Sequence, residues 1–206
     1  MTATRSHRTR LIRVDARNPE PALIKEAAVL LRRGGLVAFP TETVYGLGVN
    51  FDDPQAVQML YQVKERPFDK QVTLLLPDIE SVRRSGAEIP PAAERLMKRF
   101  WPGPMTLVLG RTDGSTTGFR VPDHPVTLAL LQAAGVPVAA PSANRSGRPP
   151  AVNASQVLAE FDGDIDMIVD SGPTAIGAAS TVVRVTGPQP EVLRAGANVE
   201  AIQALL

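Results

Sequence analysis

The sequence predicts an α/β fold of the α+β type, in which helices flank one mixed β-sheet. Short apolar runs, typical of buried strands, alternate with segments of helical period, but not strictly, which favours a mixed sheet over a parallel one. The length of 206 residues suits one domain with a substantial core and is short for two. The 19 prolines cluster at the junctions between these segments.

The first helix is expected over residues 20–33. Ile24, Ala27 and Leu31 recur there at helical spacing, and the glycine pair at 34–35 supplies a C-terminal stop. The sequence therefore places an amphipathic helix at the start of the domain.

A short buried strand, "LVAF" at 36–39, follows this helix and runs into Pro40. The next segment, "TETVYGLG" at 41–48, has the glycines of a loop that passes close to another group. A second helix is expected over 54–64, and it brings Lys64 to its last turn.

The remaining elements follow from the same signals. The buried run "VTLLL" predicts a strand at 72–76. Further strands are expected at 105–109, 118–121, 136–140, 166–170, 180–185 and 191–194, and helices at 125–134 and 153–161. No repeat and no linker long enough to divide the chain is present, so residues 19–206 are predicted to form a single domain.

Residues 1–18 are predicted to form a flexible basic arm ahead of this domain. The arm contains Arg5, Arg8, Arg10, Arg13 and Arg17. It could touch nucleic acid, but a solvated, mobile terminus is the preferred interpretation, and the pI of about 8.1 is too mild to decide between the two. No apolar stretch follows these arginines, and no run approaches the roughly 18 residues of a membrane span. We therefore expect a cytoplasmic protein without membrane contact.

Several chemistries are excluded by what the sequence lacks. Cys is absent, and the two histidines, His7 and His124, cannot form a zinc cluster. Because His124 is flanked by prolines, we interpret it as a structural loop residue. The sequence contains neither the G-x-x-x-x-G-K-[ST] of a P-loop nor the G-x-S-x-G of a nucleophile elbow. Hydrolase chemistry has little support, and any nucleotide site is not a P-loop.

Polar side chains gather at the expected strand ends and loops, which converge on one edge of an open α/β sheet. The set consists of Thr41, Thr43, Lys64, Arg66, Lys70, Thr116, Arg120, Ser142, Asn144, Ser180, Thr181 and Arg194. It is rich in cations, hydroxyls and amides and poor in carboxylates, which suits a polyphosphate. Taken singly, each residue could merely cap a turn or face solvent. Taken together, they favour an anion site.

Seven segments resemble the YrdC/TsaC family of threonylcarbamoyl-AMP synthases, in the family's order and at its spacing, from about residue 22 to 196. They are "FPTETVYGLG", "KERPFDK", "FWPGPMTLVL", "FRVPDHP", "PSANRSG", "STVV" and "LRAG". The resemblance, to the short single-domain bacterial branch, implies a YrdC-like domain whose twisted mixed sheet curves around a basic concave cavity. It also implies a nucleotidyltransferase that makes threonylcarbamoyl-AMP and pyrophosphate from L-threonine, bicarbonate and ATP. The product serves the N6-threonylcarbamoyl modification of adenosine 37 in tRNA.

By this resemblance, Lys64 and Arg66 form the catalytic K-x-R element. The residues implied for ATP are Lys64, Arg66, Lys70, Thr116, Ser142, Asn144 and Arg194. Those implied for L-threonine are Thr43, Arg120 and Ser180, with Arg120 placed to pair with its carboxylate. The resemblance implies no protein ligand for a metal, because Mg²⁺ comes with ATP. The implied partners are downstream threonylcarbamoyl-transferase proteins, with tRNA or double-stranded RNA as a further candidate.

The chain departs from the family pattern at three places. Leu75 stands where some relatives carry a His near the threonine, Ala179 stands where a Glu is common, and "PAV" at 150–152 replaces Ser-Pro-Thr. These departures concern the threonine pocket more than the ATP site. Two alternatives stay open: a paralogue with another amino-acid substrate, and a double-stranded RNA-binding or ribosome-maturation factor that uses the basic surface without chemistry.

Overall fold

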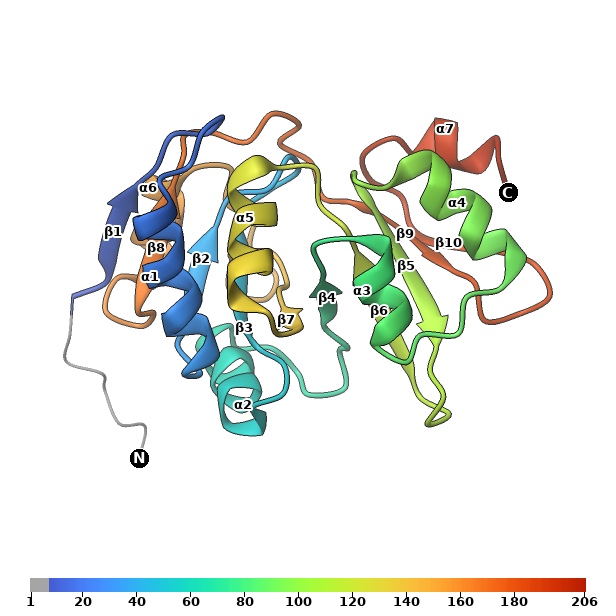
Figure 1. The fold of residues 1–206 in the computed structure, drawn as a ribbon, viewed down its shortest axis with the longest axis horizontal. Helices are drawn as coiled ribbons and strands as arrows, with labels where there is room; N and C mark the ends of the chain where they lie inside the picture. The colour runs from blue at the N-terminus through green and yellow to red at the C-terminus, as the bar shows by residue number, and fades with distance from the viewer. Residues whose placement is uncertain (1–7) are drawn as a thin grey trace.

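The computed structural model describes residues 8–206, and this part of the chain contains ten strands and seven helices (Figure 1). The strands are β1 (Arg10–Arg13), β2 (Val37–Phe39), β3 (Gly46–Asn50), β4 (Thr73–Leu75), β5 (Met105–Gly110), β6 (Thr116–Arg120), β7 (Val138–Ala139), β8 (Met167–Asp170), β9 (Thr181–Arg184) and β10 (Glu191–Arg194). The helices are α1 (Pro21–Arg32), α2 (Pro54–Val63), α3 (Ile79–Arg84), α4 (Pro91–Phe100), α5 (Pro125–Ala134), α6 (Ala154–Phe161) and α7 (Val199–Gln203).

All the strands lie in one mixed sheet, as the sequence predicts. Their order is β1-β8-β2-β3-β7-β4-β6-β5-β9-β10. The pairs β1/β8, β2/β8, β4/β6 and β5/β9 are parallel, and the remaining neighbours are antiparallel. Strands at the two ends of the sheet run in different directions in Figure 1, so the sheet is twisted.

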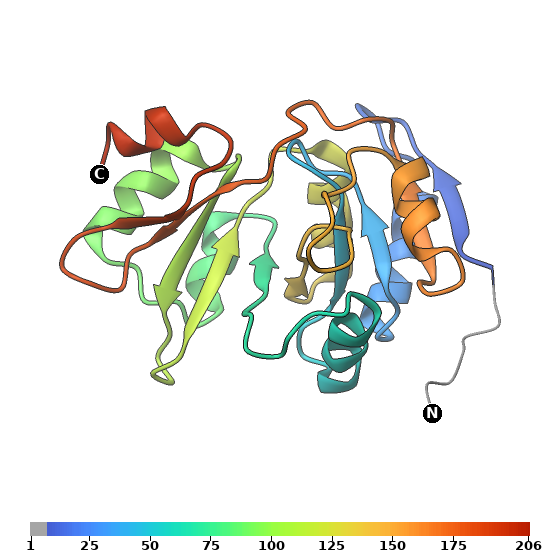
Figure 2. The same ribbon diagram turned by 180° about the vertical axis from the view of Figure 1, so that it is seen from behind.

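Helices cover both faces of the part of the sheet that contains β2, β3 and β8. In Figure 1, α1 and α5 lie side by side in front of these strands, and the view from behind in Figure 2 shows α2 and α6 on the other face. Apolar side chains fill the space on each side. The group beneath α1 and α5 includes Ile24, Leu31 and Leu130, and the group on the other side includes Leu60 and Phe161. Burial of these side chains is the main stabilising contribution to the fold.

The predicted flexible arm does not extend to residue 18. Arg10–Arg13 form β1, an edge strand paired in parallel with β8. Between the arginines, Ile12 and Val14 are 6% and 7% exposed, so an alternating apolar pattern anchors the segment to the core. Arg5 and His7 lie outside the described residues.

The segment 41–48, predicted as a loop, turns into β3 at Gly46. Its glycines are explained by the ring of Phe39 in the neighbouring strand β2. A Cβ atom at Gly48 would lie 2.5 Å from Cε1 of that ring, and one at Gly46 would lie 3.3 Å from Cε2. The close approach that the glycines indicate is therefore packing between adjacent strands.

The other predicted helices and strands agree with the structure to within two residues at each end. The prediction omitted α3, α4 and α7. Of these, α4 is strongly amphipathic and buries Ala93, Leu96, Met97 and Phe100. The prolines at its N-terminus indicated a junction rather than a first helical turn.

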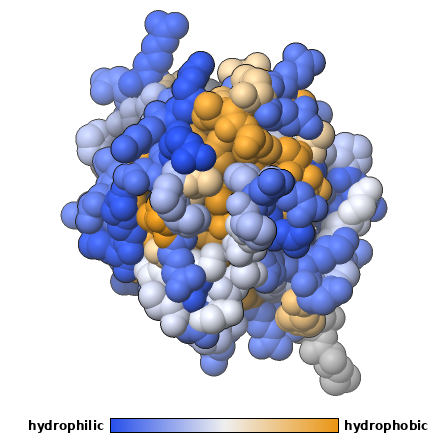
Figure 3. Space-filling view, turned by 90° about the vertical axis from the view of Figure 1, so that its right-hand side faces the viewer, coloured by the Kyte–Doolittle hydropathy of each residue, from blue (hydrophilic) through white to orange (hydrophobic). Residues whose placement is uncertain are grey.

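Residues 8–206 contain no helix that is both long and apolar enough to cross a bilayer. Figure 3 shows the side of the molecule that lies to the right in Figure 1, where an apolar area is rimmed by hydrophilic residues. The exposed large apolar side chains at this end of the sheet are Leu193 of β10 and, after α7, Leu205 and Leu206.

Candidate active site

The "KERPFDK" segment begins where α2 ends. Lys64 is the C-cap residue of α2, and it is only 2% exposed. Its Nζ donates hydrogen bonds to the carbonyl oxygens of Ser142, at 2.5 Å, and of Asn144. This cation therefore lies against the loop that contains Ser142 and Asn144, called here the S-x-N loop, and not in solvent.

The environment of Lys64 lowers its pKa to about 7. Burial is the main cause and the charge of Arg66 adds to it, whereas Glu160 acts in the opposite direction. Near neutral pH the amine is therefore present in both forms, and each form keeps the N–H groups that two carbonyls need. A bound anion would favour the charged form.

Further hydrogen bonds join the S-x-N loop to the end of α2. Arg145 donates from Nη1 to the carbonyl oxygen of Val63 at 2.8 Å. Within the loop, the Ser142 hydroxyl donates to Oδ1 of Asn144 at 2.5 Å, and Nδ2 of Asn144 donates to the carbonyl oxygen of Arg148 at 2.8 Å. The side chain of Asn144 thus shapes the loop, and the two motifs form one packed unit.

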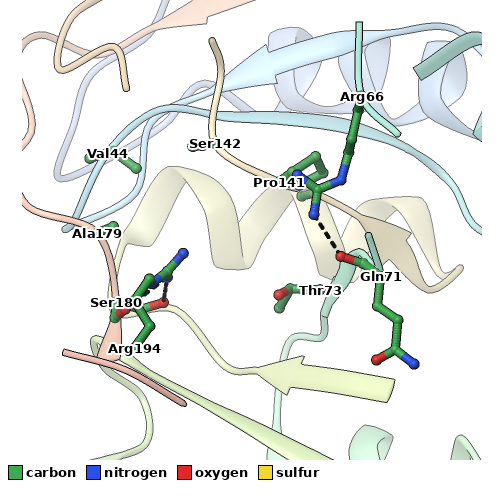
Figure 4. A pocket seen from close by; sticks show the side chains of 10 residues that line it. Val44, Arg66, Gln71, Thr73, Pro141, Ser142, Ala179, Ser180 and Arg194 are labelled. Carbon is green, nitrogen blue, oxygen red and sulfur yellow. Dashed lines mark hydrogen bonds between the residues drawn. The ribbon is translucent and has the colours of Figure 1, made fainter. Parts of the chain in front are cut away.

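A cavity of about 120 Å³ lies between this unit and the strands β4, β9 and β10 (Figure 4). It is lined by Val44, Arg66, Gln71, Thr73, Ala140, Pro141, Ser142, Ala179, Ser180 and Arg194. Figure 4 shows Arg66 and Arg194 approaching the cavity from different sides. No carboxylate occurs among these lining residues of the described chain, so the walls carry positive charge.

The two arginines are held by carbonyl oxygens. Arg66 donates from Nη2 to the carbonyl oxygen of Gln71 at 2.7 Å. Arg194 donates from Nη2 to the carbonyl oxygen of Ser180 at 2.8 Å and to its hydroxyl at 3.2 Å. Burial lowers the pKa of Arg194, and the charges of Arg120 and Arg66 add to this effect. Cations that lie close enough to disfavour one another are typical of a site arranged for an anion.

Arg120, at the end of β6, is 6% exposed and pairs with a buried carboxylate. Its Nη2 lies 2.7 Å from Oε1 of Glu42 and donates to the Thr43 hydroxyl at 2.9 Å. The Thr41 hydroxyl uses its one proton to donate to the carbonyl oxygen of Val44. The Thr43 hydroxyl, 2.8 Å from that of Thr41, is therefore the donor between the two. Because Glu42 already pairs with the guanidinium of Arg120, a substrate carboxylate that binds Arg120 would share that guanidinium with Glu42.

The structure brings some of the predicted site residues together and leaves others apart. Those that line the cavity are Arg66, Ser142, Ser180 and Arg194. Lys64 and Asn144 do not line the cavity but contact Ser142, which does. Arg120 and Thr43 contact each other and do not line it. Lys70 and Thr116 are exposed and do not line it, although the Thr116 hydroxyl accepts a hydrogen bond from Gln71 at 3.1 Å.

The sequence reasoning missed Glu42, Gln71 and Thr73. Thr73 is the one polar residue in the buried run "VTLLL", and this signal could have found it. Gln71 and Glu42 carry no comparable signal. Leu75 is buried in the core beneath α1 and α5 and is not among the residues that line the cavity.

Comparison with known proteins gives consistent matches. A family model for Sua5, YciO and YrdC, described as "Telomere recombination", matches residues 29–196. The chain is similar to a threonylcarbamoyl-AMP synthase of Bacillus subtilis (strain 168), with 44% identity over 194 residues that cover 89% of this chain and 56% of that protein. A threonylcarbamoyl-AMP synthase of Pyrococcus abyssi (strain GE5 / Orsay) is 43% identical over 182 residues, 84% of this chain and 54% of that protein. The chain spans about half the length of these curated relatives.

The structure is also similar to a crystal structure of P. abyssi Sua5 complexed with L-threonine. The TM-score is 0.91 and the identity is 41%, and the match covers 96% of this chain and 61% of that chain. Both the sequence and the fold are thus shared with these proteins over most of the described residues.

Proposed function

The chain belongs to the Sua5/YciO/YrdC family, and from this premise we propose that it is a threonylcarbamoyl-AMP synthase. The observation that carries the proposal is the cavity in which Arg66 and Arg194 approach from different sides without a carboxylate among the lining residues. A site of this composition suits phosphate groups. The similarity to a Sua5 bound to L-threonine supports an amino acid as the second substrate.

The proposed reaction joins L-threonine, bicarbonate and ATP. The threonine amine takes up CO₂ or bicarbonate as a carbamate, and a carbamate oxygen attacks the α-phosphorus of ATP. The bond from the α-phosphorus to the bridging oxygen breaks, and pyrophosphate leaves with its electron pair. Carbamate formation from bicarbonate also releases one water, so the products are threonylcarbamoyl-AMP, pyrophosphate and water, and the reaction is a nucleotidyl transfer.

The protein's contribution to this reaction is charge and orientation. Negative charge grows on the α-phosphoryl oxygens and on the leaving pyrophosphate. Arg66 and Arg194 stabilise that charge from fixed positions, and Lys64 adds a third positive charge when it is protonated. Because orientation and electrostatics suffice for phosphoryl chemistry of this kind, no protein nucleophile is required.

The size of the cavity limits what it holds. About 120 Å³ is smaller than the roughly 300–1,000 Å³ of typical small-molecule sites. We therefore place the reacting phosphate and the amino acid inside and the rest of the nucleotide over the rim, where Gln71 contacts Thr116. Lys70, exposed on the same loop, would meet the outer phosphates.

We propose that Mg²⁺ enters the site together with ATP. Residues 8–206 contain no group of three side chains suited to hold a metal ion, and the described cavity walls offer no carboxylate. The phosphates of ATP would supply its ligands, and the ion would offset their charge. Ser180, Thr43 and Arg120 are proposed to hold L-threonine: Ser180 lines the cavity, and Arg120 donates to the Thr43 hydroxyl.

The product would pass in the cytoplasm to threonylcarbamoyl-transferase proteins that modify adenosine 37 of tRNA. Incubation of the protein with ATP, bicarbonate and isotopically labelled L-threonine tests the function, with the adenylate identified by mass spectrometry. We expect labelled threonylcarbamoyl-AMP that disappears when bicarbonate is removed. Tight binding of double-stranded RNA without adenylate formation would instead support the RNA-binding alternative.

A further inference from the structure

The loop of residues 65–71 separates two hollows of the molecule. On one side, Arg66 and Gln71 line the cationic cavity. On the other, Tyr61 and Phe68 line an apolar groove of about 450 Å³ beside α2. The position of Arg66 in the cavity therefore depends on how this loop is held from the groove side.

Tyr61 contacts both ends of the loop. Its carbonyl oxygen accepts the backbone N–H of Arg66 at 2.9 Å, and its hydroxyl donates to the carbonyl oxygen of Lys70 at 2.7 Å. Nε of Arg66 donates to the same carbonyl oxygen at 3.2 Å. Tyr61 and the side chain of Arg66 thus share one acceptor, so a shift of Lys70 moves the guanidinium as well.

The ring of Tyr61 also holds the middle of the loop. Phe68 is 69% exposed, yet its ring stacks on that of Tyr61 with centroids 5.0 Å apart and an interplanar angle of 23°. Tyr61 itself is 8% exposed and belongs to the core beside α2. The side chain of Tyr61 therefore fixes the middle and the end of an otherwise exposed loop, and its backbone carbonyl fixes the beginning.

We propose that Tyr61 is a positioning residue that holds Arg66 in the phosphate-binding orientation without touching the substrate. The inference rests on the proposed function for the identity of the anion. A residue that only packs the core would need the ring of Tyr61 but not its hydroxyl. The hydroxyl is therefore the part to remove.

Tyr61→Phe keeps the ring and its stack with Phe68 and removes one hydrogen bond. The loss of one neutral hydrogen bond corresponds to a roughly three- to tenfold change in an equilibrium. We expect ATP to bind about three- to tenfold more weakly to Tyr61→Phe, with little change in melting temperature. In an Arg66→Ala background the same substitution should change ATP binding less than twofold.

Tyr45→Phe is the matched control. It also removes a tyrosine hydroxyl that donates to a carbonyl oxygen, that of Gly172, at 2.8 Å. The Tyr45 hydroxyl contacts no residue of the loop, so any effect of its removal on ATP binding should be the same with Arg66 and with Ala at that position.

The experiment combines ATP titration calorimetry on this double-mutant cycle with hydrogen exchange of the loop 65–71. We expect faster exchange of the loop in Tyr61→Phe and no change in Tyr45→Phe. Unchanged loop exchange, or equal losses of ATP affinity with and without Arg66, would overturn the inference. If the wild-type protein does not bind ATP, the proposed function fails, and the exchange measurement still decides whether Tyr61 holds the loop.

Discussion

Nζ of Lys64 lies 2.5 Å from the carbonyl oxygen of Ser142, so the two motifs that bear most of the candidate site are in direct contact. The ammonium group is buried under the S-x-N loop and also donates to Asn144. Lys64 therefore places a titratable positive charge next to the loop that lines the cavity. This charge makes the proposed ATP site sensitive to pH.

The affinity for ATP should fall as pH rises above about 7. The pKa of Lys64 in the free protein is lowered to about 7, mainly by burial, and a phosphate favours the charged form. Above that pH the amine must take up a proton when ATP binds, which weakens binding by at most about tenfold per pH unit. Calorimetric titration between pH 6 and 9 measures this slope. Lys64→Met should remove most of the slope, and an unchanged slope would contradict the role of Lys64.

Lys64 should give the stability of the free protein the opposite pH dependence: the unfolding free energy should rise with pH, whereas the ATP affinity falls. In the unfolded chain Lys64 titrates at the ordinary value of 10.5, so between about pH 7 and 10.5 the unfolded state binds more protons. The contribution of Lys64 to the unfolding free energy therefore rises with pH across this window and is lost as pH falls towards 7. Denaturant unfolding of the wild type and of Lys64→Met at pH 7 and 9 tests this. A stability difference that does not depend on pH would argue against a neutral, buried amine.

Arg66→Ala should reduce turnover by more than tenfold. The substitution removes a charge-assisted contact to phosphate worth about 1.5 to 3 kcal/mol. Arg184→Ala is the control, because Arg184 is an exposed arginine of β9 that pairs with Glu191 and does not line the cavity. Initial rates of pyrophosphate release compare the variants. Similar losses at both positions would favour a diffuse RNA-binding surface over a defined site.

Arg120→Ala should destabilise the protein by about 3–5 kcal/mol and also impair the use of L-threonine. The loss in stability is expected because Glu42 would keep a buried charge without its partner. Adding Glu42→Gln should restore much of the stability but not the use of threonine. Chemical denaturation and the KM for threonine separate the two effects. If the double variant regains activity together with stability, Arg120 acts only through the fold.

Gly48→Ala should destabilise the protein by about 1–3 kcal/mol. The new Cβ would lie 2.5 Å from Cε1 of Phe39 and 2.9 Å from Cγ1 of Val138, and two buried side chains would have to move. Gly187→Ala separates this crowding from the loss of backbone freedom, because Gly187 is also not left-handed and a Cβ there would approach only the carbonyl oxygen of Gln189, at 4.0 Å. Thermal unfolding provides the measurement. Equal losses at both positions would indicate that backbone conformation dominates.

Most of the fold could be predicted from local patterns in the sequence. The helices α1, α2 and α5 carry apolar residues at helical spacing, and the buried strands are short apolar runs between turn residues. The strand β3 could not be predicted in this way, because its glycines are explained only by the ring of Phe39 across the sheet. The strand β1 was not predicted, because its arginines indicated a solvated arm, although Ile12 between them is buried.

The candidate site was predictable where a motif carries it and not where the contacts are long-range. Motifs identified Arg66, Ser142, Ser180 and Arg194, which the fold brings to one cavity. The motifs did not indicate that Arg120 pairs with Glu42, because the two residues are far apart in the sequence and come together only when the sheet forms. Gln71 also lines the cavity without a signal in the sequence, whereas Thr73 could have been found as the one polar residue of the buried run "VTLLL".

Release of pyrophosphate from ATP, measured with and without L-threonine and bicarbonate, tests the proposed function most directly. We expect release only when all three substrates are present. Threonine should be preferred and serine discriminated weakly, because a missing methyl in such a pocket is worth only about 1–3 kcal/mol, whereas valine should be a poor substitute because it lacks the hydroxyl. Pyrophosphate release that does not require threonine would contradict the function. Equal rates with valine and threonine would show that no hydroxyl is recognised, and the assignment of threonine would then be wrong even if ATP binds.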